Sequence, residues 1–387
     1  MKKILFGIIC TVLFSSCFSY VDEYIEVSSF PKYSWQQAAD SSSSSLLESH
    51  WNAATNHFNN DNHGNIGRWD YWPEAHGLDV LVDAYLRTGD EKYKTHIYNF
   101  FNGVRAKNGS NTWYNNYYDD MGWHGMAHLR ALEATDDARY ETSARQLWGH
   151  IVPSGWDPEK GGIRWNHENT PEGLSTGVPS TGPATIIAAR RWQKYGNTET
   201  FGGDNDSIWM ARCYHWMKDN CRVSQSGRIF ENINDTRGDW TYNAGTFIGA
   251  ALELYKVTGE KMYLNDAIKT ADWAIGFLID GNNRVLSDWA EQTDHDVNLF
   301  KGIFVRYFTR LIMNDDLPDV KRKRYTAFMV NSANYLWTTG TLKYPAILYS
   351  HRWWEPLTGD VSYLRSQLSG CMMLEAMALL EKEGYLD

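Results

Sequence analysis

The sequence carries little positive charge. Lys and Arg together number 37 among its 387 residues, whereas Asp and Glu number 47, and the formal net charge is −10. Nucleic acids and anionic lipid surfaces are bound mainly by clustered basic side chains that neutralise phosphate groups. We therefore expect no nucleic-acid partner.

The usual cysteine and histidine motifs for metal binding are also missing. The chain has five cysteines and 12 histidines but neither a CxxC nor an HExxH pattern, which are common spacings of zinc sites. We expect no metal site. Three cysteines lie beyond the N-terminal segment, at Cys213, Cys221 and Cys371. An odd number does not suit a disulfide framework, so we expect buried free thiols.

Long apolar runs are absent except at the N-terminus. Residues 1–17, MKKILFGIICTVLFSSC, combine two lysines, an apolar stretch and small residues before Cys17, a pattern typical of a secretory signal and too short to span a bilayer. The last four residues resemble a bacterial lipobox, which predicts lipidation of Cys17; plain secretion is the alternative.

This N-terminus predicts where the protein resides. We expect residues 18–32 to be a tether and residues 33–387 to be one folded domain. The lipobox predicts an outer-membrane lipoprotein of the bacterial cell envelope, facing the cell surface or the periplasm. Its only contact with the membrane would then be the lipid anchor.

Aromatic residues are unusually frequent. They make up 14% of the chain, with 18 Trp and 23 Tyr, which is more Trp than a core requires. Flat aromatic faces pack well against sugar rings, so this composition favours a carbohydrate-binding protein. The alternative is a large helical protein that uses Trp to fill its core.

One pattern recurs along the chain at steps of roughly 50–60 residues. Segments 78–93, 126–140, 186–201 and 248–263 each have helical apolar spacing, end in a turn rich in Thr, Gly or Asp, and lead into a second helix. Such pairs must stack to bury their apolar faces. We predict an all-α fold of repeated helix hairpins that closes into a ring, an α-toroid, and we expect a monomer; an open solenoid is the alternative.

The stretch YYDDMGW, residues 117–123, places two like charges side by side among aromatic residues. Two carboxyls ~5 Å apart suit retaining glycoside hydrolysis, in which one attacks the anomeric carbon and the other protonates the leaving oxygen. Each charge raises the pKa of its neighbour, as a general acid requires. The alternative is that an aspartate only caps the helix that follows, which would explain one of the two.

YYDDMGW and four further segments, in the same order, resemble glycoside hydrolase family 76, the endo-α-1,6-mannanases. The further segments are EAHGLDVLVDAYLRTGD, GWDPEKGGIRWNHE, YNAGTFIGAALELYKVTGEKMYL and DVNLFKGIFVRYFTRL. The resemblance implies an (α/α)6 barrel that cleaves α-1,6-linked mannan of the fungal cell-wall type with retention. It also implies Asp119 as nucleophile, Asp120 as acid/base, and no cofactor. Segments 180–187 and 228–234 differ from the family pattern and are expected to shape subsite walls.

The same motifs supply candidate sugar-binding residues, although the tryptophans among them could equally be core. Asp296 ends the stretch 294–296, which is expected to line the cleft. Two other functions stay open: a catalytically silent toroid that binds mannan, and a different toroid enzyme acting on carbohydrate. Endo and exo action also stay open. The candidates are Trp72, Tyr118, Trp123, Trp165, Tyr242, Asn243, Phe300 and Lys301.

Overall fold

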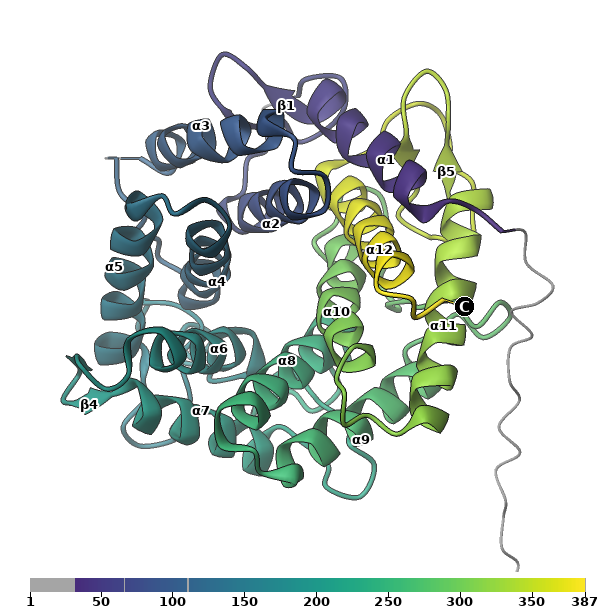
Figure 1. The fold of residues 1–387 in the computed structure, drawn as a ribbon. Helices are drawn as coiled ribbons and strands as arrows, with labels where there is room; N and C mark the ends of the chain where they lie inside the picture. The colour runs from purple at the N-terminus through teal and green to yellow at the C-terminus, as the bar shows by residue number, and fades with distance from the viewer. Residues whose placement is uncertain (1–31, 66, 110, 387) are drawn as a thin grey trace, which may run out of the picture.

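A closed double ring of helices forms the fold (Figure 1). The structure is a computed structural model and describes residues 32–65, 67–109 and 111–386. In these residues there are twelve helices, each inner helix paired with an outer one. The prediction of an all-α barrel built from helix hairpins is therefore confirmed.

Six helices line the inside of the ring. Each contacts the next inner helix, and the last contacts the first, so that the ring closes. The inner helices are α2 (Tyr71–Thr88), α4 (Tyr118–Thr135), α6 (Val178–Tyr195), α8 (Thr241–Thr258), α10 (Val297–Ile312) and α12 (Leu364–Lys382). The outer helices are α1 (Trp35–His50), α3 (Glu91–Lys107), α5 (Ala138–Gly155), α7 (Asp206–Asn220), α9 (Lys261–Phe277) and α11 (Asp319–Thr338).

The recurring turn in the sequence joins an inner helix to the outer helix that follows it. After α2, Gly89 adopts φ 68° and donates its N–H to the carbonyl of Tyr85, which ends the helix. Asp90 then accepts a hydrogen bond from Lys92 N and starts α3. A left-handed residue followed by a capping aspartate reverses the chain within a few residues. These tight turns all lie at the C-terminal ends of inner helices.

Serines 41–45 lie inside α1, although serine favours helix ends over helix interiors. Their small side chains let α1 pack closely on its neighbours, and their hydroxyls are bonded. Ser43 Oγ donates to Glu375 on α12, and Ser45 Oγ accepts from Ile347 N. The tertiary contacts therefore outweigh the weak helix propensity of serine.

Strands are few and short in the described residues. Three two-residue antiparallel pairs close loops at the edge of the ring. They are β1 (Trp51–Asn52) with β2 (His57–Phe58), β3 (Thr200–Phe201) with β4 (Asp204–Asn205), and β5 (Thr341–Leu342) with β6 (Leu348–Tyr349).

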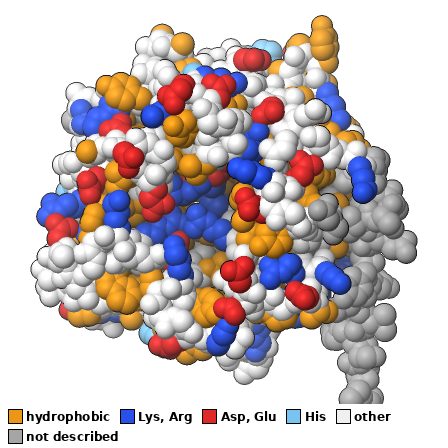
Figure 2. Space-filling model, viewed as in Figure 1, with side chains coloured by type: hydrophobic (Ala, Val, Ile, Leu, Met, Phe, Trp, Pro, Cys, Tyr) orange, Lys and Arg blue, Asp and Glu red, His pale blue; other side chains and the backbone are white. Residues whose placement is uncertain are grey.

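The C-terminal ends of the inner helices surround a hollow of about 270 Å³, and Figure 2 shows Lys and Arg side chains gathered in its centre. The arginines are ion-paired with inner-helix carboxylates: Arg130 with Asp79, and Arg306 with Asp83. Helix C-termini favour cations, so the network is suited to this rim. The longer loops, with more varied side chains, lie at the opposite rim.

Cys213, Cys221 and Cys371 are buried and free, as predicted. Among the described residues no helix is long and apolar enough to cross a membrane. The predicted signal peptide, Cys17 and nearly all of the tether lie outside the described residues.

Candidate active site

A cleft of about 540 Å³ opens at the N-terminal ends of the inner helices. Seven of the candidate catalytic and sugar-binding residues line it together: Asp119, Asp120, Trp72, Trp123, Trp165, Tyr242 and Phe300. They come from the first two turns of four inner helices and from the loop after α5. Closure of the ring therefore brings distant motifs to one place. The other lining residues are Arg68, Trp69, Asp70, Tyr71, Asn115, Tyr117, Glu231 and Asp296.

The aspartate pair occupies the first turn of α4. The N-cap residue of this helix is Tyr117, whose side chain makes no capping hydrogen bond, and both aspartates lie inside the helix. The interpretation of one aspartate as the helix cap is therefore wrong. Both carboxyls are half-buried and face the cleft. The positive end of the helix dipole beneath them favours negative charge at this point.

The two carboxyls have unequal surroundings. Asp119 Oδ1 accepts a hydrogen bond of 3.0 Å from Asp120 N, and its Oδ2 accepts one of 3.1 Å from Trp165 Nε1. Burial raises the pKa of Asp119 to about 7, although these donors act in the opposite direction. Within the described residues no group donates to Asp120. Burial, then the charges of Asp119, Asp70 and Asp296, raise its pKa well above the ordinary value.

This difference assigns the proton. Hydrogen bonds stabilise the ionised form of Asp119, whereas the field of three carboxylates opposes ionisation of Asp120. When the pair holds one proton, the proton is therefore on Asp120. One carboxylate and one carboxylic acid are the two groups that glycoside hydrolysis needs.

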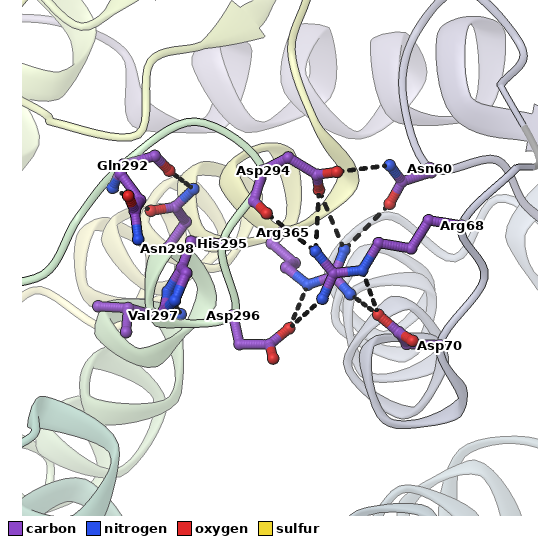
Figure 3. Close-up of polar contacts among 10 residues, drawn as sticks. All are labelled: Asn60, Arg68, Asp70, Gln292, Asp294, His295, Asp296, Val297, Asn298 and Arg365. Atoms are coloured by element: carbon purple, nitrogen blue, oxygen red, sulfur yellow. Dashed lines mark hydrogen bonds and ion pairs between the residues drawn. The ribbon is translucent and has the colours of Figure 1, made fainter.

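Two arginines hold a group of carboxylates on one wall of the cleft (Figure 3). Arg68 donates to Asp70 at 2.9 Å and to Asp296 at 3.1 Å. Arg365, which is buried, donates to Asp296 at 2.7 Å and also to Asp70. Asp294 pairs with both arginines but does not line the cleft. The wall thus presents fixed acceptors to a polar ligand.

Glu231 is a third carboxyl near the pair, and the sequence did not single it out. Its side chain accepts hydrogen bonds from Trp240 Nε1 at 2.6 Å and from Tyr242 Oη at 3.4 Å. Burial raises the pKa of Glu231, and its charge contributes to the raised pKa of Asp119. Glu231 lies in the segment 228–234. The departure of this segment from the family pattern was the one sequence signal that could have pointed to Glu231.

Aromatic rings form much of the remaining surface. Tyr242 stacks on Phe300 with ring centroids 3.9 Å apart. The ring of Trp72 lies 6.2 Å from that of Phe300, and the ring of Trp123 lies 6.3 Å from that of Tyr242. Across the cleft, Tyr117 packs on Trp165 at 5.1 Å. Such faces bind the C–H surfaces of sugar rings, while the carboxyls bind hydroxyl groups.

Three predicted binding residues do not line the cleft, and these placements correct the expectation. The ring of Tyr118 stacks on His167 at 4.2 Å, because the helical turn directs it away from its neighbours Asp119 and Asp120. Asn243 is fully buried. Lys301 is also fully buried; its Nζ lies 2.6 Å from Glu291 Oε1 and donates to the carbonyl of His351.

The cleft continues into a second hollow of about 660 Å³. Trp165 and Glu231 line both spaces, and Ser175, Asn232 and Asn234 line the second. Polar loop residues thus extend the groove beyond the aspartate pair. In the described residues, no group of three or more His, Cys, Asp or Glu side chains is placed to hold a metal ion.

The fold is similar to that of solved bacterial proteins. An α-1,6-mannanase from Salegentibacter sp. HEL1_6 is 37% identical, with a TM-score of 0.81 over 89% of this chain and 99% of that one. An inactive variant of that enzyme, with two aspartates at adjacent positions replaced, was solved in complex with α-1,6-mannotetrose. A protein from Listeria innocua is 28% identical, with a TM-score of 0.79 over 91% of this chain and 99% of that one.

Curated relatives come from fungi. A mannan endo-1,6-alpha-mannosidase of Candida albicans is 25% identical over 56% of this chain, and the match spans about half (51%) of that relative. A putative one from Schizosaccharomyces pombe is 21% identical over 80% of this chain and 74% of its own. These fungal relatives contradict the predicted localisation as a bacterial outer-membrane lipoprotein, which is withdrawn.

The family resemblance read from the five motifs agrees with these likenesses. A family model described as glycosyl hydrolase family 76 matches residues 34–386, nearly the whole chain. The chain belongs to glycosyl hydrolase family 76.

Proposed function

We propose that this protein is a retaining endo-α-1,6-mannanase, with Asp119 as nucleophile and Asp120 as acid/base. The observation that carries the proposal is the unequal pair of carboxyls in an aromatic-lined cleft. The likeness to an α-1,6-mannanase at 37% identity supports the choice of substrate. That relative was made inactive by changing two adjacent aspartates, which supports the choice of residues.

In the proposed first step, Asp119 attacks the anomeric carbon and forms a covalent mannosyl–enzyme ester. The O–H bond of Asp120 breaks as its proton moves to the leaving glycosidic oxygen. In the second step, the Asp120 carboxylate takes a proton from water, and the hydroxide formed displaces Asp119 from the anomeric carbon. The product keeps the configuration of the substrate.

The surroundings of each carboxyl fit these steps. Trp165 Nε1 holds Asp119 in one orientation and stabilises its charge before attack. The negative charge of Asp119 is one cause of the raised pKa of Asp120. When Asp119 forms the ester it loses this charge, and the pKa of Asp120 falls. Asp120 therefore changes from acid to base when the reaction needs it.

The shape of the groove supports endo action. The cleft that holds the pair continues past Trp165 and Glu231 into the second hollow. A groove of this combined length has room for several sugar units of a chain. An enzyme that removed single terminal residues would need only a short pocket beside the pair.

The test uses linear α-1,6-mannan and the variants Asp119→Asn and Asp120→Asn. The native protein is expected to release oligosaccharides of several lengths with α-configured reducing ends, seen by NMR during the first turnovers, and both variants are expected to lose roughly 10³-fold or more in kcat. Release of β-configured ends would contradict retention. Binding of mannan without any release by the native protein would favour the silent toroid instead.

A further inference from the structure

Trp289 lies on the surface in the loop between α9 and α10. Its side chain is 76% exposed, and it is the only exposed tryptophan among the described residues. One face of its ring stacks on Trp240, with centroids 4.8 Å apart and planes inclined by 22°. An indole held in this way offers a flat apolar surface to solvent.

Trp240 connects this surface to the cleft. Its ring lies edge-on to Phe300 at 5.9 Å, and its Nε1 donates to Glu231 at 2.6 Å. Phe300 and Glu231 both line the cleft that holds the aspartates. Aromatic rings therefore continue from the cleft to the exposed indole in steps comparable with the span of one pyranose ring.

The loop that carries Trp289 is anchored on both sides of it. Asp288 accepts hydrogen bonds from Thr241 N at 2.8 Å and Thr241 Oγ1 at 2.6 Å, which ties the loop to the start of α8. Glu291 accepts from Asp288 N at 2.9 Å and pairs with the buried Lys301 on α10. The position of the indole is thus set by buried polar contacts before any ligand binds.

A single exposed apolar side chain is common and by itself needs no explanation. Trp289 differs because Trp240 links it to the cleft residue Phe300 and because its loop is bonded to two inner helices. Its exposed face would otherwise leave a large apolar area in water, which is unfavourable by about 25 cal/mol per Å². A sugar ring covers such a face without forming a protein interface.

We propose that Trp289 is an outlying binding subsite, at which a mannopyranose unit of a substrate chain already held in the cleft stacks on the indole. The inference rests on the proposed function for the identity of the sugar. It makes the enzyme selective for long chains, because an oligosaccharide confined to the cleft does not reach Trp289. The subsite contributes to binding and takes no part in bond cleavage.

The test compares α-1,6-mannotetraose with linear α-1,6-mannan as substrates for the native protein, Trp289→Ala and Trp289→Phe. For Trp289→Ala, KM for the polymer is expected to rise roughly 3- to 10-fold, the effect of losing one aromatic stacking contact. Its kcat and its kinetics on the tetraose should stay unchanged, and Trp289→Phe should keep most of the affinity. Tyr98→Ala, at an exposed aromatic on outer helix α3, is the matched control and should behave as the native protein.

A second measurement separates this proposal from the proposed function. Native protein and Trp289→Ala are run in native gels that contain linear α-1,6-mannan, which retards a protein that binds the polymer. If the mannan retards the native protein but not Trp289→Ala, the subsite is supported even when no turnover occurs. Equal retardation, or equal KM for the polymer, overturns the subsite and leaves the proposed function standing.

Discussion

The indole Nε1 of Trp165 donates a hydrogen bond of 3.1 Å to Asp119 Oδ2, across the start of α4. The bond joins two motifs 46 residues apart in the sequence. It places a fixed donor on the carboxyl that we propose as the nucleophile. Together with the backbone N–H of Asp120, this donor opposes the effect of burial, which raises the pKa of Asp119.

Replacement of Trp165 by Phe keeps an aromatic face and removes the donor. Loss of a hydrogen bond to a charged group costs about 1.5–3 kcal/mol, so kcat is expected to fall roughly 10- to 100-fold. The carboxylate form of Asp119 becomes less stable and its pKa rises. Activity that requires this carboxylate is present above its pKa, so the acid limb of the pH–rate profile should move to higher pH.

The control for this change is Trp72→Phe, at a cleft aromatic that packs near Phe300 and, among the described residues, makes no hydrogen bond to Asp119 or Asp120. It should alter KM and leave the acid limb in place. An unchanged acid limb in Trp165→Phe would show that the indole does not stabilise the charge of Asp119.

The native pH–rate profile should be bell-shaped. Its acid limb reports ionisation of Asp119, whose pKa is raised to about 7, and its basic limb reports loss of the proton from Asp120, whose pKa is higher. Asp296→Asn removes a negative charge that opposes ionisation of Asp120. The pKa of Asp120 then falls, and the basic limb should move to lower pH by up to about one unit.

Asp136→Asn is the matched control for the basic limb, because Asp136 ends the same helix at the opposite rim. Rates on linear α-1,6-mannan across a pH series test both variants. A basic limb that stays in place in Asp296→Asn would contradict the assignment of that limb to Asp120.

Local chemistry allowed the ring to be predicted. The helical spacing of 78–93 and the Thr-Gly-Asp turn at 88–90 are both local signals, and the structure uses them as α2, its left-handed end at Gly89 and the cap of α3. Repetition of the same turn implied stacked hairpins. The run of serines in α1 gives no local helix signal, because the contacts that hold it, such as Ser43 with Glu375 on α12, are distant in sequence.

The site was predicted only where a motif marked it. Asp119 and Asp120 stood out as an adjacent pair, but sequence proximity also suggested Tyr118, which the helix turns away from them. Asp70 and Glu231 belong to loops that meet only after the ring closes, and each needs a partner from another segment to be held there. The local sequence of each loop does not show which partner will hold it.

The acid pair should lower stability at alkaline pH. The pKa of both carboxyls is raised in the folded protein, so each favours the fold while it is protonated, and this stabilisation is lost as pH rises toward and through the folded pKa. Asp120→Asn removes the effect. Its free energy of unfolding should match that of the native protein near pH 4 and exceed it by about 1–2 kcal/mol at pH 8.

Thermal unfolding followed by circular dichroism at pH 4, 6 and 8 measures this difference, with Asp136→Asn again as the control. A stability gain for Asp120→Asn that is the same at all three values would mean that repulsion and burial of the charge are not its cause.

Lys301 should behave as a structural residue. It is fully buried and pairs with the buried Glu291 at 2.6 Å. Lys301→Met leaves the Glu291 charge without its partner, which costs about 3–5 kcal/mol, and urea unfolding should show a loss of this size. Lys92→Met, at an exposed lysine on α3, should change stability by less than about 0.5 kcal/mol.

The double variant Lys301→Met, Glu291→Gln removes both charges and should recover part of the lost stability, since no buried charge is left unpaired. Its KM for α-1,6-mannotetraose should equal that of the native protein, because neither side chain reaches the cleft. A large rise in that KM would instead show that Lys301 binds the sugar. Its ion pair with Glu291 would then serve to position a ligand-binding side chain.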